Sequence, residues 1–219
     1  MRDFRFHTAE VLPELRLHYT TVGASTGEPV LILHGTTGSG ASLLRPAFAG
    51  ELFGPGQPLD ASRYSIILPD AIGTGKSSRP SDGLRTRFPK YNYDDMVDAQ
   101  YRLVTEHLGV RHLRLVLGNS MGGMQTWIWA QKYPDFMDIA VPMASLPTEM
   151  SGRNWMLRRL IIDAIIGRSD TQRPLVFRSV KRLRTPCAEP RKKASNDGPT
   201  SGDPHGSGNH TSADPVSRL

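Results

Sequence analysis

The sequence Gly118-Asn119-Ser120-Met121-Gly122 decides the fold, because it joins a buried strand to a helix through small residues. The apolar run Leu113–Leu117 predicts the strand, and Met121–Gln131 predicts a helix that ends before Pro134. A G-x-S-x-G pentad at such a junction is typical of a nucleophile elbow, a sharp turn that raises a serine hydroxyl above the sheet. An ordinary tight turn is the alternative, and the surrounding sequence decides between the two.

Around this junction, strand patterns alternate with helical patterns. Short apolar or alternating runs predict further strands at residues 15–22, 29–34, 64–69 and 138–144. Asp94–His107 has helical spacing, with Asp94 or Asp95 as a plausible N-cap and Gly109 as the stop. Arg153–Ile166 is predicted to be an amphipathic helix, with Trp155, Leu157, Leu160, Ile161, Ala164 and Ile165 on its apolar side. The order predicts an α/β fold with a mostly parallel sheet.

Two glycine-rich loops follow the strands that precede the pentad. The loop His34–Gly40 can aim backbone N–H groups at a reaction centre, and we assign His34 itself a packing role. Asp70–Ser77 ends in Gly-Lys-Ser, as does a nucleotide-binding P-loop. Asp70, however, occupies the position of the first P-loop glycine, where a carboxylate would repel phosphate. No helical pattern follows Ser77 either, so the sequence disfavours a nucleoside triphosphatase.

Taken in this order, His34–Ser39, Asp70–Ser77 and Gly118–Gly122 resemble the motifs of the α/β-hydrolase superfamily. The stretches Gly118–Gln125, Phe53–Asp60, Trp129-Ala130 and Tyr133-Pro134-Asp135 resemble its homoserine O-acetyltransferase-like branch. The resemblance covers about Phe4 to Asp170. It implies an α/β-hydrolase fold and either acyl transfer or ester hydrolysis.

The resemblance also implies site residues. Ser120 would be the nucleophile that forms an acyl-enzyme, and the backbone N–H groups of Thr36 and Met121 would hold the oxyanion. No metal or cofactor is implied. The partner would be a small-molecule ester or acyl donor, with acetyl-CoA as a possible co-substrate.

The triad partners that this superfamily needs are not evident in the sequence. They should follow the serine as Asp or Glu and then His, each after a later strand. The histidines after Ser120 are His205 and His210, and the acids Asp135, Asp138, Asp163 and Asp170 do not follow a new strand. We therefore expect impaired catalysis, with a non-catalytic binding or scaffold protein as the alternative.

The composition changes near Asp170, which predicts a partial hydrolase domain at residues 1–170 and a disordered tail at 171–219. The tail holds nine Lys and Arg against four Asp and Glu, a net charge of +5, and six of the 17 prolines. Residues 185–214 contain no Val, Ile, Leu, Met, Phe, Trp or Tyr. Because the change is abrupt, we expect residues 171–219 to be an out-of-frame translation or a similar gene-model error.

The remaining expectations concern partners and location. The basic clusters Lys181–Arg184 and Arg191–Lys193 have no interleaved aromatic residue, so we expect a solvated tail and no nucleic-acid partner. No apolar run reaches the ~20 residues that span a bilayer, and the N-terminus lacks an apolar leader segment. These features predict a cytoplasmic protein without a membrane partner. The sequence leaves the oligomeric state open.

Overall fold

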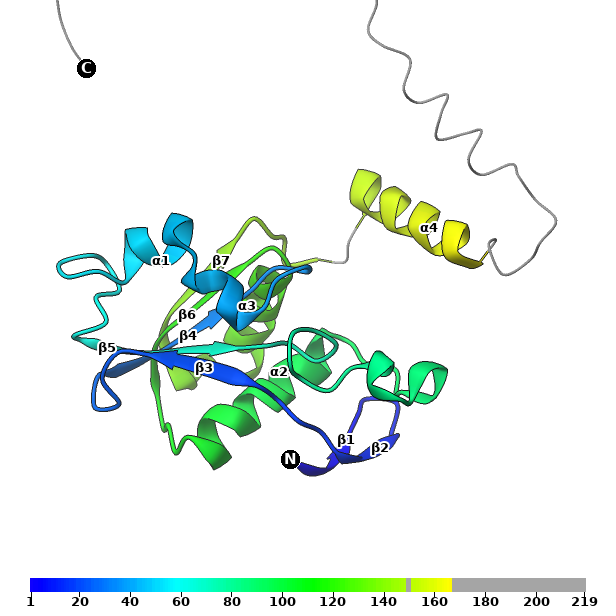
Figure 1. Cartoon of the computed structure of the whole chain (residues 1–219), viewed down its shortest axis with the longest axis horizontal. Helices are drawn as coiled ribbons and strands as arrows, with labels where there is room; N and C mark the ends of the chain where they lie inside the picture. The colour runs from blue at the N-terminus through cyan, green and yellow to red at the C-terminus, as the bar shows by residue number, and fades with distance from the viewer. Residues whose placement is uncertain (149–150, 167–219) are drawn as a thin grey trace, which may run out of the picture. The chain divides into compact units, whose positions relative to one another are not determined.

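The computed structural model describes residues 1–148 and 151–166 (Figure 1). The chain divides into two compact units, Met1–Met156 and Leu157–Leu219. In the described part of the first unit, a five-stranded sheet has the order β3-β5-β4-β6-β7. Its strands are β3 (Tyr19–Val22), β4 (Glu28–Leu33), β5 (Tyr64–Pro69), β6 (Leu113–Asn119) and β7 (Met137–Met143). The predicted strands are confirmed, with one shortened.

The sheet is mostly parallel, as the alternating pattern predicts. β4 pairs in parallel with β5 and β6, β6 pairs in parallel with β7, and β3 is antiparallel to β5. In the register, Leu33 lies opposite Gly118. The loops that follow β4 and β6 therefore leave the sheet at the same edge, so the chain beyond Leu33 meets the pentad.

The first predicted strand is shorter than the alternation of residues 15–22 suggested. The carbonyl of Arg16 accepts a hydrogen bond from the Ser78 N–H, and that of His18 accepts one from Asp70. Residues 16–18 thus pair with the loop after β5, and the strand begins only at Tyr19. Leu15 is fully buried in a core cluster instead.

Helices cover both faces of the sheet. Successive side chains along a strand point to opposite faces, so each strand packs against helices on both sides. Val30 and Ile32 of β4 point to the face covered by a short 3₁₀ helix (Gly40–Leu44) and α1 (Pro46–Leu52). Leu31 and Leu33 point to the opposite face, against α2 (Tyr93–Arg102) and α3 (Met121–Lys132). Figure 1 shows α1 and α2 on opposite sides of the sheet.

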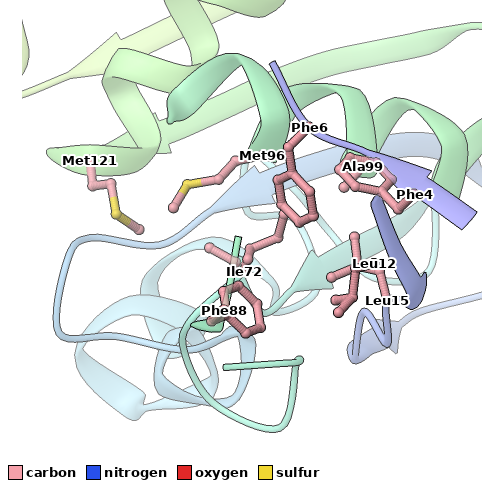
Figure 2. Close-up of a cluster of buried hydrophobic side chains, with 10 residues drawn as sticks. Phe4, Phe6, Leu12, Leu15, Ile72, Phe88, Met96, Ala99 and Met121 are labelled. Atoms are coloured by element: carbon pink, nitrogen blue, oxygen red, sulfur yellow. The ribbon is translucent and has the colours of Figure 1, made fainter. Parts of the chain in front are cut away.

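An N-terminal hairpin, β1 (Arg2–Arg5) and β2 (Val11–Glu14), forms a separate two-stranded sheet that the sequence did not reveal. Its apolar side chains join a buried cluster with residues of the loops, of α2 and of the start of α3 (Figure 2): Phe4, Phe6, Leu12, Leu15, Ala71, Ile72, Phe88, Met96, Ala99 and Met121. Both strands have four residues, the shortest run that can show a period-2 pattern, and β2 contains Pro13, which disfavours a strand in the sequence. Three further 3₁₀ turns are Pro80–Asp82, Arg85–Arg87 and Pro134–Phe136.

The N-cap predicted for the second helix is wrong. Asn92 caps α2, its side chain accepting a hydrogen bond from the Asp95 N–H, while the Asp95 carboxylate accepts one from the Asn92 N–H. This reciprocal pair gives partners to two backbone N–H groups at the start of the helix that would otherwise be free. A cap at Asp94 or Asp95 would not do so. The helix continues as one π-helical turn, Leu103–His107, and stops before Gly109, whose φ of 66° confirms the predicted stop.

Helix α4 (Gly152–Ile166) forms where a helix is predicted, but it is not amphipathic. Met156, Ile162 and Ile166 fall outside the predicted apolar side, so apolar residues occur all round it. None of the helices in the described residues is long and apolar enough to cross a membrane. The expectations for the tail, 171–219, lie outside the described residues.

Candidate active site

Ser120 lies at the sharp turn between β6 and α3, with φ 55° and ψ −110°. This backbone conformation is uncommon for a residue with a side chain. Two hydrogen bonds hold it: the Ser120 N–H donates to the Met143 carbonyl at 2.9 Å, and the Ser120 carbonyl accepts from the Met124 N–H at 3.0 Å. The residue is exposed, so the turn presents the hydroxyl to solvent at the edge where the parallel strands end.

Two glycines allow this turn, as the pentad predicts. A Cβ on Gly118 would lie 2.1 Å from the Gly122 carbonyl oxygen, and one on Gly122 would lie 2.2 Å from the Leu33 oxygen. Both contacts are with backbone, which cannot move aside as a flexible side chain can. The start of α3 therefore packs directly on β6 and on the end of β4, and only glycine fits at either position.

The loop after β4 is held by His34, whose side chain is buried and bonded at both ring nitrogens. Its Nε2 accepts a hydrogen bond from the Ala71 N–H at 3.0 Å. Nδ1 therefore carries the proton and donates to the Gly35 carbonyl at 2.7 Å. Burial lowers the pKa of His34, which keeps the ring neutral near pH 7.

The loop after β5 is built around the buried carboxylate of Asp70. One oxygen accepts the Gly40 N–H at 2.7 Å, and the other accepts the Lys76 N–H at 2.8 Å and lies 3.0 Å from Nδ1 of His18. A Cβ on Gly75 would lie 2.1 Å from this carboxylate. The carboxylate thus fills the space and uses the N–H that a P-loop would offer to phosphate, which supports the rejection of that alternative.

The Thr36 N–H belongs to the loop after β4, and the Met121 N–H directly follows Ser120 at the start of α3. Gly35, which precedes Thr36, is close enough that its Cβ would lie 3.7 Å from the Ser120 Cβ. Neither N–H donates a hydrogen bond within the residues that the structure describes. The Met121 side chain is anchored in the cluster of Figure 2, near Met96 and Ile72, which fixes the first turn of α3.

Asp135 and Asp138 are not brought to Ser120. Asp138 lies at the opposite end of β7, where it bonds His112 and Arg114. These contacts, His112 first, lower the pKa of the Asp138 carboxyl. Asp135 lies in a 3₁₀ turn and Asp163 pairs with Arg159 on α4. Within residues 1–148 and 151–166 no side chain hydrogen-bonds the Ser120 hydroxyl, while Asp170, His205 and His210 lie outside these ranges.

Across the part of the chain that the structure describes, no group of three His, Cys, Asp or Glu side chains is placed to hold a metal ion. The groups available at the serine turn are a hydroxyl and two free backbone N–H donors. They suit a reaction in which negative charge develops on a carbonyl oxygen.

Sequence reasoning did not find the connections that His34 and Asp70 make between the two loops. The sequence predicts a packing role for a histidine before a glycine-rich turn, and the acid after a buried strand argues there only against a P-loop. Each side chain bonds to the backbone of the other residue's loop, and such contacts are set by tertiary structure. The available signal was the placement of each residue directly after a buried parallel strand.

Comparison with known families and proteins agrees with this geometry. The sequence model of the alpha/beta hydrolase fold family matches residues 28–164. A homoserine O-acetyltransferase of Geotalea daltonii is 35% identical, over 66% of this chain and 44% of the relative. One from Solidesulfovibrio magneticus is 42% identical, over 53% of this chain and 33% of the relative.

Solved structures give the same result at the level of the fold. The acetyl esterase MekB has a TM-score of 0.66 and 30% identity, covering 75% of this chain and 48% of its own. A homoserine O-acetyltransferase from Bacillus anthracis has a TM-score of 0.53 and 24% identity. The match covers 64% of this chain and 44% of that protein. The chain thus spans less than half the length of these relatives and structures.

Proposed function

Because the chain belongs to the alpha/beta hydrolase fold family, we propose that Ser120 is the nucleophile of a serine-dependent acyl transfer or ester hydrolysis. One observation carries the proposal. Ser120 occupies a strained, exposed turn between β6 and α3, and the N–H groups of Thr36, in the loop after β4, and of Met121, the first residue of α3, have no partner in the described residues. Free donors of this kind beside a serine are suited to bind the oxygen of a tetrahedral intermediate.

The proposed chemistry has two steps. The Ser120 oxygen attacks the ester or thioester carbonyl while its proton passes to a base, and the carbonyl oxygen takes the electron pair. The two N–H groups stabilise this oxyanion, each by about 3–4 kcal/mol of the barrier. The intermediate collapses to an acyl-serine and the leaving group takes a proton. Water or an alcohol then attacks the acyl-serine by the same route and frees Ser120.

The base is the part that the described residues do not supply. A serine hydroxyl without a base is a weak nucleophile, and loss of a triad member leaves about 10³–10⁴-fold catalysis over water. A working enzyme of this kind needs a histidine, oriented by an acid, from outside residues 1–148 and 151–166. If none reaches Ser120, we expect weak activity from the serine and the two N–H donors alone.

The acyl group that we propose is acetyl. Two of the relatives are named as homoserine O-acetyltransferases and one solved structure as an acetyl esterase, so transfer or hydrolysis of an acetyl group is common to their names. The sharpest version is transfer from acetyl-CoA to the hydroxyl of homoserine. Hydrolysis of a small acetyl ester is the version that needs only water.

Two assays on the full chain test this proposal. The first follows p-nitrophenyl acetate hydrolysis, and the second follows thiol release from acetyl-CoA with and without homoserine. We expect Ser120→Ala to lower the activity about tenfold or more, to what the two N–H donors and substrate binding alone supply, while Ser25→Ala, at an exposed loop serine, keeps it. Thiol release that requires homoserine indicates a transferase. Activity in Ser120→Ala equal to that of the unaltered chain contradicts the proposal, and inactivity of the unaltered chain in both assays favours a non-catalytic scaffold.

A further inference from the structure

The loop that carries Thr36 is fastened at both of its ends by the loop after β5. At its start, Nε2 of His34 accepts the Ala71 N–H at 3.0 Å. At its end, the Gly40 N–H donates to the Asp70 carboxylate at 2.7 Å. Ala71 and Asp70 are adjacent, so one short segment of the β5 loop holds residues 34 and 40 together.

Between these two points, one carbonyl fixes the orientation of the Thr36 N–H. The Gly35 oxygen accepts two hydrogen bonds, from Nδ1 of His34 at 2.7 Å and from the Gly38 N–H at 2.9 Å. A carbonyl has two lone pairs, and both are engaged here. The Gly35 carbonyl and the Thr36 N–H belong to one planar trans peptide group and point in opposite directions. Holding the oxygen toward His34 therefore directs the N–H away from it.

The geometry points to His34 and Asp70 as positioning residues of the oxyanion site, a role that rests on the proposed function of Ser120. His34 sets the peptide plane of Gly35 and Thr36, and Asp70 fixes the far end of the loop. Neither residue touches the substrate.

The hydrogen-bond pattern permits only one state of the His34 ring. The Ala71 N–H points at Nε2, so a proton on Nε2 would bring two donors together. The ring must be neutral, with its proton on Nδ1, for both bonds to form. The lowered pKa of His34, caused first by burial, agrees with this state.

The first test uses the unaltered full chain and does not depend on its activity. A long-range ¹H–¹⁵N spectrum reports which ring nitrogen carries the proton. We expect His34 to be the neutral Nδ1–H tautomer at about pH 8 and to titrate with a pKa below that of a free imidazole. An Nε2–H tautomer, or titration with the pKa of a free imidazole, overturns the inference.

The second test compares three substitutions. His34→Asn keeps an N–H donor where Nδ1 lies but loses the acceptor for Ala71, and His34→Leu loses both. Leu113→Ala is the control, because Leu113 is a buried residue at the other end of β6. Urea titration identifies conditions in which all three variants remain folded. The readouts are the second-order rate of Ser120 phosphonylation by a fluorophosphonate probe and the hydrogen exchange of the Gly38 amide.

We expect His34→Leu to slow phosphonylation about tenfold or more, in line with the loss from a misplaced oxyanion donor. Leu113→Ala should stay within about threefold of the unaltered chain, and His34→Asn should fall between His34→Leu and Leu113→Ala, because it keeps the donor to Gly35 but loses the acceptor for Ala71. Gly38 exchange should rise about tenfold or more in His34→Leu, relative to Leu113→Ala, because the Gly35 acceptor is released. Equal phosphonylation rates in His34→Leu and Leu113→Ala overturn the positioning role.

The two readouts also separate this inference from the proposed function. If the unaltered chain does not react with the probe, the proposed function of Ser120 fails. Gly38 exchange then still decides whether His34 holds the Gly35 carbonyl. Exchange that is the same in His34→Leu and Leu113→Ala contradicts the fixed peptide plane, whatever the reactivity of Ser120.

Discussion

The backbone at Ser120 adopts φ 55° and ψ −110°, a conformation that costs a residue with a side chain about 1–3 kcal/mol. The structure compensates with the bond from the Ser120 N–H to Met143 and with close packing through Gly118 and Gly122. Single residues thus determine whether the turn exists at all. This is why a five-residue pattern could predict its location.

The first prediction concerns Gly122. We expect Gly122→Ala to lower the free energy of unfolding by about 3 kcal/mol or more, because the new Cβ meets the Leu33 oxygen at 2.2 Å. Gly50→Ala is the matched control, since Gly50 is inside α1 and its Cβ would make only an ordinary 3.8 Å contact. That variant should gain about 0.5–1 kcal/mol, because alanine favours helices. Urea unfolding measures both, and similar values would refute the packing argument.

The second prediction is a pH dependence that originates at His34. Its folded pKa is lowered by burial from an ordinary value of about 6.5, so the unfolded chain binds the proton more readily. The neutral His34 ring makes its full contribution to the free energy of unfolding above about pH 6.5. This contribution is lost as the pH falls toward the folded pKa. Melting temperatures from about pH 7.5 to 5 should therefore fall more steeply for the unaltered chain than for His34→Asn, and parallel curves would be contrary evidence.

Among the helices and strands, those with long and consistent patterns were predicted well. The predictions near β4, β5, β6, β7 and α3 agree with the structure to within a residue or two. The misses have physical causes: β1 and β2 have four residues each, and Asn92 caps α2 through a reciprocal bond with Asp95. A third miss is α1, which was not predicted from the sequence. This helix begins at Pro46, and only a short 3₁₀ helix precedes it. Such local features leave only a weak signal in the sequence, because tertiary contacts select among several conformations that the same residues allow.

The contact between α2 and α3 gives the third prediction. The Gln100 side chain donates to Gln125 at 2.6 Å and accepts from the Trp129 indole N–H at 2.9 Å, all three buried. We expect Gln100→Leu to cost about 2–4 kcal/mol, because two buried groups lose their partners. Urea unfolding checks this value.

A double-mutant cycle provides the control for that prediction. Gln100→Leu should cost less when Gln125 is already leucine, because one unsatisfied group has then been removed. Equal costs in both backgrounds would mean that the hydrogen bond between the two glutamines does not contribute to stability.

In the whole molecule, the candidate site forms because parallel strands end at one edge of the sheet. Each of β4, β5 and β6 is followed directly by one residue of the site: His34, Asp70 and Ser120 respectively. The sequence distance from the first to the third exceeds half the length of the described chain. Motif order and strand direction made this convergence predictable. The bonds from His34 to Ala71 and from Asp70 to Gly40 were not predictable, because they depend on how two irregular loops pack.

The fourth prediction concerns the tail. Its apolar-poor composition leads us to expect that trypsin cleaves first beyond about residue 170, at Lys and Arg sites, while a fragment that contains the sheet persists. Mass spectrometry of the early products identifies the cleavage sites. Early cleavage at Arg63 or Arg114, with the tail intact, would contradict the expected division of the chain.

If the turn at Ser120 presents a reactive nucleophile, site mapping with a fluorophosphonate probe should find it. The full chain is treated with the probe, digested, and the modified peptide is identified by mass spectrometry, with Ser120→Ala and Ser25→Ala treated in parallel. The account predicts a single adduct on Ser120, retained in Ser25→Ala and absent from Ser120→Ala. An adduct on another residue, or no adduct on the folded unaltered chain, would contradict it.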